Sequence, residues 1–379
     1  MNIKNNSIVF SIAFTCLFFL CLLFSGCPTG GESLLWTIKD AVKVPDNSLK
    51  NNLTINSMVL AGGDFYIACG TSFFRRSSTD LWQTVPLPAG MALNTAIANA
   101  GANLVCGFVS SDGAAGLYTT NSFPVIGWQK IDDGNVNGKQ ITKFFNANST
   151  TIFCAGTIVS GDVGTFALYT TDGTTVATTL VTDLHQPVLA VVWDTANYWI
   201  LTSSTIYKTA NLAVAPTAYS GSGLSGPFSG MLFSTTTNNY YIASENGVIY
   251  YTSNTASSWT GVSNTTDHST TQTVLGQAVI FSEMAIIGND ILIGTNKVDF
   301  YQMKDLANPS ETLVRAADKS DLQLKDGSPT NNIINSKLYT AYVLGFFING
   351  NDVYFRTGGN GLISNSFTAS IWGSDWTQE

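Results

Sequence analysis

The stretch NYYIASENGVIYYTSNTASSW, residues 239–259, carries the pattern that decides the fold of this chain. Two short runs rich in Tyr and Ile, residues 239–243 and 248–251, are separated by small and polar residues. Tyr and Ile favour strands, whereas Asn and Ser favour turns. A polar turn then leads to Trp259. The stretch therefore predicts two paired strands followed by a turn and a further strand.

The same unit recurs seven times along the chain. In each copy an apolar run precedes a polar turn, and two strand-like runs follow. These paired runs lie at residues 64–68 with 72–75, 103–106 with 116–119, 151–154 with 166–169, 197–201 with 205–207, 239–243 with 248–251, 290–293 with 298–301, and 352–355 with 361–363. The first turn recurs every 39 to 62 positions, about 48 on average, which is in the range of propeller blades.

Seven units of four strands predict an all-β fold, a seven-bladed β-propeller with four-stranded antiparallel blades. A single blade cannot cover both of its faces, so neighbouring blades must bury them, and closing the ring protects the edges. We expect residues 34–39 to form the outer strand that closes the ring. Residues 372–377 are the alternative for that place. A pair of β-sandwiches remains the alternative to the propeller as a whole.

The second strand of many units ends on Tyr, followed three or four residues later by Asn or Asp, as in Tyr169 and Asp172. A Trp then opens the outer strand at Trp82, Trp128, Trp259 and Trp372. Residues 252–259 resemble the Asp-box (BNR-type) propeller repeat, Ser/Thr-x-Asp-x-Gly-x-x-Trp, with Asn for Asp and Ala for Gly. The Asp box forms a turn, so this resemblance implies a fold and no activity.

The first 26 residues have the form of a lipoprotein signal peptide. A polar start with Lys4 precedes an apolar run that ends before Cys27, and small residues stand directly before that cysteine. The motif resembles a relaxed lipobox, so we expect cleavage after residue 26 and lipidation of Cys27. Residues 27–33 would form a short tether and residues 34–379 the propeller domain. A retained signal anchor is the alternative.

The composition argues against several partners and sites. The net charge is −8, and no basic cluster stands out, so nucleic acid is an unsuitable partner. Cys69, Cys106 and Cys154 follow strand-like apolar runs without metal-binding spacing. Blade faces pack about 10 Å apart, whereas disulfides need Cα atoms within about 7 Å, so we expect three unbridged, buried thiols.

No catalytic constellation, cofactor site or metal site emerges from the sequence. The only histidines, His185 and His268, fall in different units. Sialidases use six-bladed Asp-box propellers, in which three arginines bind the substrate, whereas this sequence has seven units. Arg75 and Arg76 are adjacent here, so on a strand they should point to opposite faces. We therefore expect no enzyme, with a sialidase-like glycoside hydrolase as the least favoured alternative.

Three polar segments are candidate binding sites. Residues 110–113 and 325–328 contain Asp in turns, without the spacing of known calcium loops. Residues 319–335 form a long polar insertion between the sixth and seventh units, of the kind that often carries function. We interpret the first two as ordinary turns and the third as a surface loop or a partner site.

The sequence thus predicts a non-enzymatic binding module, held by a lipid anchor at the membranes of the bacterial cell envelope and facing a protein or glycan partner. A periplasmic scaffold for envelope assembly is the alternative. The short tether would keep the domain close to its membrane.

Overall fold

The computed structural model describes residue 49 and residues 53–77, 81–157, 164–253, 258–263, 273–274, 277–278, 280–296, 300–303, 305–307, 314–315, 342–373 and 377–379. All of them belong to one compact unit, Asn47–Glu379. No helix long and apolar enough to cross a membrane occurs among these residues. The segments expected to be the signal peptide, Cys27 and the tether lie outside them, as do residues 319–335.

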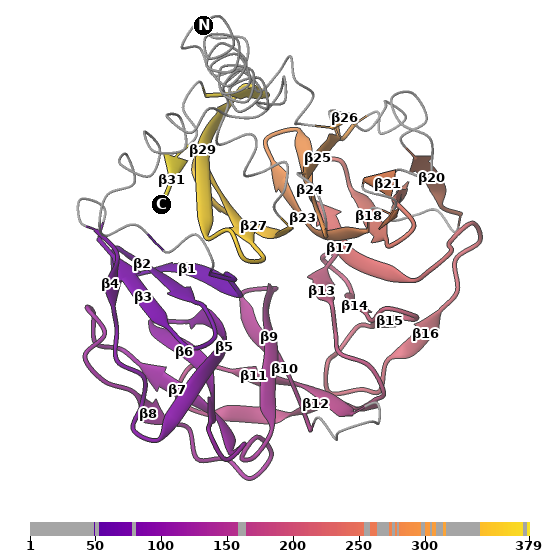
Figure 1. The fold of residues 1–379 in the computed structure, drawn as a ribbon. Helices are drawn as coiled ribbons and strands as arrows, with labels where there is room; N and C mark the ends of the chain where they lie inside the picture. The colour runs from indigo at the N-terminus through magenta and orange to yellow at the C-terminus, as the bar shows by residue number, and fades with distance from the viewer. Residues whose placement is uncertain are drawn as a thin grey trace, which may run out of the picture. The chain divides into compact units, whose positions relative to one another are not determined.

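Seven antiparallel sheets stand around a central axis, one for each unit of the sequence (Figure 1). The inner strands are β1 (Ser57–Ala61), β5 (Met91–Ala100), β9 (Gln140–Ala147), β13 (Ala190–Trp193), β17 (Phe228–Ser234), β23 (Phe281–Ile287) and β27 (Val343–Asn349). The second strands are β2 (Asp64–Ala68), β6 (Asn103–Ser110), β10 (Thr150–Thr157), β14 (Tyr198–Leu201), β18 (Asn239–Ser244), β24 (Asp290–Thr295) and β28 (Asp352–Thr357).

The third and outer strands complete each blade. The third strands are β3 (Phe73–Arg76), β7 (Ala115–Thr120), β11 (Thr165–Thr171), β15 (Ile206–Thr209), β19 (Val248–Ser253), β25 (Phe300–Met303) and β29 (Leu362–Thr368). The outer strands are β4 (Gln83–Thr84), β8 (Gln129–Lys130), β12 (Val176–Leu184), β16 (Thr217–Tyr219), β20 (Thr260–Ser263), β26 (Val314–Arg315) and β31 (Thr377–Gln378). The predicted seven-bladed propeller is confirmed, and each predicted hairpin is the pair of middle strands of a blade.

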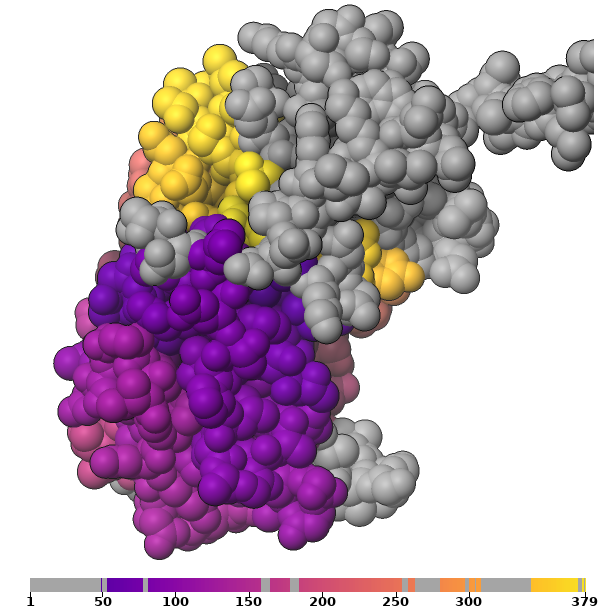
Figure 2. All heavy atoms as spheres, turned by 60° about the vertical axis from the view of Figure 1, so that its left-hand side comes forward, coloured from indigo at the N-terminus to yellow at the C-terminus, as the bar shows by residue number. Residues whose placement is uncertain are grey.

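The hydrophobic core is divided among the seven interfaces between neighbouring blades. Seven clusters of buried side chains occur within the described residues, and each combines residues of two adjacent blades. Full burial of a Leu, Ile or Phe side chain stabilises a fold by about 1.5–3 kcal/mol. Figure 2 shows the atoms of the first two blades as one continuous surface. A lone blade could not bury these side chains, because one of its faces would have no neighbour.

The ring closes differently from the expectation. The outer place of the last blade, beside β29, is occupied by the C-terminal strand β31, which pairs at Ile363 and Ser364. Residues 34–39, the expected closing segment, lie outside the described residues, and only Thr377 of β31 belongs to the alternative segment, residues 372–377. β31 begins at Thr377, close in sequence to the end of β29 at Thr368, so this pairing avoids the entropic cost of joining chain segments hundreds of residues apart.

The N-terminal part of the chain nevertheless contributes to closure. The N–H of Ile55 donates to the carbonyl of Thr357 at 3.0 Å, and the N–H of Gly361 donates to Leu53 at 3.0 Å. Arg76 of the first blade forms an ion pair with Glu379 at the C-terminus. Within the described residues, the two ends of the propeller are therefore held together by hydrogen bonds and a charge pair.

The turn signature behaves as its chemistry predicts. The side-chain Oδ1 of Asp172 accepts hydrogen bonds from the N–H groups of Thr174 at 2.7 Å and Thr175 at 2.8 Å. Asn211 caps its turn in the same way, by accepting from Ala213 at 2.9 Å. Trp82, Trp128 and Trp259 directly precede the outer strands, as expected. Trp372 differs, because it lies in β30 (Ile371–Trp372), a short strand paired with the end of β29.

One described element was not anticipated. A small hairpin, β21 (Thr273–Val274) with β22 (Gln277–Ala278), lies between the fifth and sixth blades and forms its own two-stranded sheet. Its residues alternate too little in polarity to be distinguished from a loop by pattern alone.

Candidate functional site

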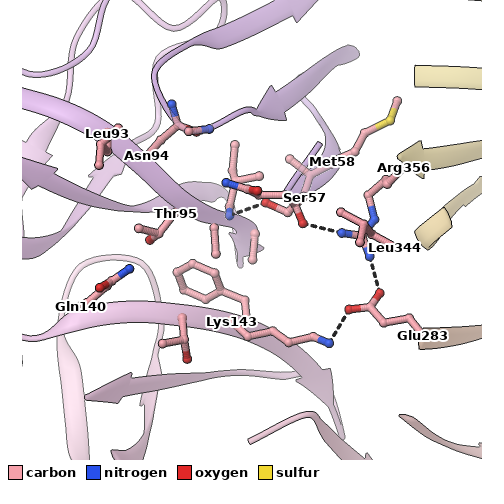
Figure 3. Close-up of a pocket in the computed structure, with 18 of the residues that line it drawn as sticks. Ser57, Met58, Leu93, Asn94, Thr95, Gln140, Lys143, Glu283, Leu344 and Arg356 are labelled. Atoms are coloured by element: carbon pink, nitrogen blue, oxygen red, sulfur yellow. Dashed lines mark hydrogen bonds and ion pairs between the residues drawn. The ribbon is translucent and has the colours of Figure 1, made fainter. Parts of the chain in front are cut away.

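A cavity of about 680 Å³ opens at the centre of the ring, lined mainly by the inner strands (Figure 3). The side chains come from β1, β5, β9, β23 and β27, and Arg356 reaches it from the second strand of the last blade. Cavities of this size hold small ligands or short chain segments. The centre of the propeller is thus the natural candidate site.

Irregularities in the inner strands direct side chains into this cavity. The pairing register shifts between Asn94 and Ile97 in β5 and between Phe281 and Met284 in β23. A β-bulge breaks the strict alternation of a strand and changes the direction in which a side chain points. Thr95 and Ala96, which lie at the first of these shifts, both line the cavity.

Three charged side chains from different blades meet in the cavity. Lys143 of β9 forms an ion pair with Oε1 of Glu283, which lies on β23. Arg356 of β28 forms an ion pair with Oε2 of the same carboxylate. Figure 3 shows Lys143 and Arg356 reaching the two oxygens of Glu283 from different directions. We call Lys143, Glu283 and Arg356 the channel triad.

The members of the triad differ in exposure. The side chain of Arg356 is only 10% exposed, while Lys143 and Glu283 are 31% and 30% exposed. Arg356 is further fixed because its Nη1 donates to the backbone carbonyl of Asn56. The guanidinium is therefore a structural anchor, and the ammonium of Lys143 is the cation that solvent or a ligand can reach.

The charge state of Glu283 is determined by its neighbours. Burial acts to raise the pKa of this carboxyl, but the charges of Arg356 and Lys143 and their hydrogen bonds outweigh burial and lower the pKa to about 2. Glu283 is consequently ionised at any physiological pH. Such a carboxylate can hold a counter-charge, but it has no proton to donate in general acid catalysis.

A glycine makes the triad possible. A Cβ atom at Gly345 would overlap both Nη2 of Arg356 and Oε2 of Glu283. Gly345 lies on β27, at a register shift between Val343 and Gly345. The missing side chain leaves the space through which Arg356 reaches Glu283.

The remaining wall combines aliphatic and amide side chains. Leu93 is 40% exposed at the beginning of β5, and Leu344 lines the same cavity from β27. The aromatic rings there are engaged in the core, since Phe346 packs edge-on against Phe300 and Phe355. Gln140 and Asn146 supply amide groups. The wall thus provides aliphatic contacts together with hydrogen-bond donors and acceptors.

A second carboxylate with a lowered pKa lies away from the channel, between the fourth and fifth blades. Asp194 is 4% exposed and accepts hydrogen bonds from Trp199 Nε1 at 2.7 Å, from Tyr240 Oη, and from the backbone N–H groups of Ala196 and Asn197 at 2.9 and 2.6 Å. Burial opposes its ionisation, but these hydrogen bonds outweigh burial and lower the pKa. Its partners are neutral groups that hold two blades together.

The thiols and the histidine that the sequence singled out lie outside the channel. Cys69, Cys106 and Cys154 are buried and unbridged, as predicted, and burial raises the pKa of each thiol, to about 12 for Cys69. His185 lies on the surface, while His268 falls outside the described residues. The cavity lining includes none of the side chains of Cys69, Cys106, Cys154 and His185.

The arginines do not converge as a sialidase site would require. Arg75 pairs with Asp64 at 2.6 Å, and Arg76 pairs with Glu379, so the two point apart as expected. Among the arginines with described side chains, only Arg356 lines the cavity. The outer strand β26 contains Arg315, whose side chain is not described.

The turn at residues 110–113 uses its Asp for local bonding. Asp112 Oδ1 accepts hydrogen bonds from Ser110 Oγ and from the N–H of Ala114, the latter at 3.3 Å, and the hydroxyl of Ser110 is the main cause that lowers its pKa. No group of three potential metal ligands occurs among the described residues. The second Asp-containing turn, residues 325–328, lies outside them, and Cys27 does too.

Sequence comparison identifies no relative of the chain. No known protein-family model matches it, and no curated protein matches it in sequence.

The solved structures show what the fold is. YCF48 bound to D1 peptide matches with a TM-score of 0.58 and 12% identity, covering 85% of this chain and 95% of that one. The GH74 xyloglucanase from Xanthomonas campestris matches with a TM-score of 0.57 and 13% identity, covering 85% of this chain and 54% of that one. The extracellular domain of BT4673 from B. thetaiotaomicron reaches 0.54 at 10% identity, over 84% of this chain and 39% of that one.

This chain is a β-propeller. The matched structures include enzymes as well as a peptide-binding protein, so their similarity settles the architecture and leaves the activity to the residues of this chain.

Proposed function

We propose that the chain is a non-enzymatic binding module, which holds a segment of a partner protein in the central channel of its propeller. The observation that carries this proposal is the channel triad, in which the only carboxylate among the described lining residues is bound to two cations. An exposed cation, aliphatic side chains and amides are features of a recognition surface.

The same observation weighs against hydrolysis of glycosides. Most glycosidases place two carboxyl groups about 5–10 Å apart, one of which must be protonated to assist the leaving group. Glu283 has no carboxyl neighbour among the described lining residues, and its pKa of about 2 keeps it ionised. Because GH74 enzymes share the fold, a panel of fluorogenic glycosides is the control, and turnover that disappears in Glu283→Gln would contradict the proposal.

A bound peptide in a structure of similar fold supports a protein partner. YCF48 is one matched structure that was solved with a peptide. At 12% identity this similarity supplies only the scaffold. The choice of a peptide ligand therefore rests on the aliphatic and amide lining of the channel described above.

The expected place of action is the bacterial cell envelope, with Cys27 acylated and the propeller attached to a membrane. Incorporation of an alkyne-labelled fatty acid into the chain tests this directly. Wild-type protein should be labelled and recovered with membranes, whereas Cys27→Ser should lose the label. Labelling that persists in Cys27→Ser would contradict the lipid anchor.

The binding function is tested by site-specific photo-crosslinking in intact cells. A crosslinking amino acid at Gln140, on the wall of the channel, should capture a defined protein partner. The same amino acid at Gln129, on the outer strand β8, is the matched control and should not. Capture that is equal at both positions, or absent from Gln140, would contradict binding in the channel.

Surface proteolysis of whole cells separates the binder from the assembly scaffold. A propeller that is removed by added protease faces outward and fits a binder of external partners. A protected propeller fits a periplasmic scaffold that holds other proteins during assembly.

A further inference from the structure

The charge balance of the channel is opposite to that of the whole chain. Two cations and one carboxylate among its described lining residues give +1, whereas the chain carries −8. A positive site inside an acidic protein is not expected from composition. It favours the binding of anionic groups inside the central cavity.

The cation that a ligand could reach is Lys143. An ammonium group has three N–H donors, and the triad places Oε1 of Glu283 against this nitrogen. The side chain is 31% exposed, and it also lies over the Phe145 ring at 5.8 Å from the ring centroid. The ammonium that donates to Glu283 has two further N–H groups, and the partial exposure of the side chain gives a second anion access to them.

Glu283 stands where an external carboxylate would be bound best. One carboxylate oxygen of Glu283 pairs with Lys143, and the other pairs with the anchored Arg356. Each oxygen therefore accepts a charge-assisted hydrogen bond. Glu283 is thus an internal counter-ion, which lowers the cost of holding two cations in the channel without a ligand.

We propose that the channel binds a peptide segment through a carboxylate of that peptide, an Asp or Glu side chain or a C-terminus, at Lys143, in competition with the internal counter-ion Glu283. This assignment rests on the proposed function and names its ligand chemistry. The aliphatic neighbours of the site, Leu93 and Leu344, would contact apolar side chains beside the carboxylate. The Gln140 amide can pair with a peptide group of the backbone.

The two charged residues make opposite predictions. Lys143→Met removes the cation and should reduce affinity for an acidic peptide at least tenfold, as expected for the loss of a charge-assisted hydrogen bond. Glu283→Gln removes the competing charge while keeping the shape, and should increase the affinity severalfold. A purely structural role would instead make both substitutions weaken binding.

The probes are hexapeptides with a central Glu or Asp, compared with matched Gln or Asn versions, and glycans ending in uronic or sialic acid compared with neutral ones. Binding is measured with the full chain in detergent. Lys130→Met, on the exposed outer strand β8, is the control with the same charge change and should have no effect. Thermal unfolding of each variant confirms that it is folded.

The expected result is a preference of tenfold or more for the acidic peptides, lost in Lys143→Met and increased in Glu283→Gln. No preference for acidic peptides, or weaker binding in Glu283→Gln, would overturn the inference. Acidic glycans bound in place of peptides would overturn the choice of ligand class. If crosslinking at Gln140 captures a partner but Lys143→Met captures as much, the proposed function holds and this inference fails.

Discussion

Asp194 and Glu283, two of the carboxylates with lowered pKa values in this propeller, owe them to different physical causes. Asp194 is sealed between the fourth and fifth blades, where neutral donors satisfy it. Glu283 stands in the central cavity between two cations, and 30% of its side chain remains exposed. The hydrogen bonds of Asp194 hold two blades together, whereas the partial exposure of Glu283 allows it to respond to another charge. A perturbed pKa is therefore informative only together with the space around it.

The largest effect should come from breaking the blade contact. Asp194→Ala leaves the buried Trp199 N–H and the Tyr240 hydroxyl without their acceptor, and each orphaned donor costs about 1–3 kcal/mol. We expect the free energy of unfolding in urea to fall by about 3 kcal/mol. Asp112→Ala, in an exposed turn, is the control and should change it little. An equal loss in both variants would contradict the structural role of Asp194.

An intermediate effect should follow from filling the space beside the triad. In Gly345→Ala, the new Cβ overlaps Arg356 and Glu283, so these flexible side chains must move apart. We expect a loss of about 1–2 kcal/mol, similar to other overpacked sites, together with at least tenfold weaker peptide binding. Gly127→Ala is the matched control, because nothing lies within 4 Å of its added Cβ. Unchanged binding in Gly345→Ala would show that the triad geometry is irrelevant.

The smallest effect concerns acid stability. The pKa of Glu283 is lowered from 4.5 to about 2 in the folded protein, so its ionised form stabilises the fold above about pH 4.5, and that contribution is lost as the pH falls toward 2. Wild-type protein should therefore lose stability between pH 5 and pH 2, as followed by urea unfolding. Glu283→Gln should show a shallower loss over this range. An identical slope in the two proteins would contradict the pKa direction.

The sequence determined the blades far better than the channel. Each blade follows from local signals, such as the Tyr- and Ile-rich runs at 239–243 and 248–251, which pair across a short turn. The cost of closing such hairpins is small, so local pattern and final structure agree. The pairing of β31 beside β29 differed from the expected closure by residues 34–39, because residues 34–39 and 372–377 both have the pattern of an outer strand.

The channel triad could not be predicted, because its members are distant in sequence. Lys143 and Glu283 are 140 positions apart, and Glu283 and Arg356 are 73 apart. One signal was present, since each is a charged residue inside an otherwise strand-like run. Charged residues in strands are normally expected on solvated faces, and only the bulges of the inner strands and the position of Gly345 bring these three together.

The central claim is that Glu283 is an internal counter-ion, which an acidic ligand displaces from Lys143. It is tested by measuring, on one preparation of Glu283→Gln, both the urea unfolding midpoint and the affinity for an acidic hexapeptide. We predict a smaller loss of stability than in Asp194→Ala, because the ion pair with Lys143 is partly exposed to solvent, together with a severalfold gain in affinity. An affinity that stays the same or falls would contradict the claim.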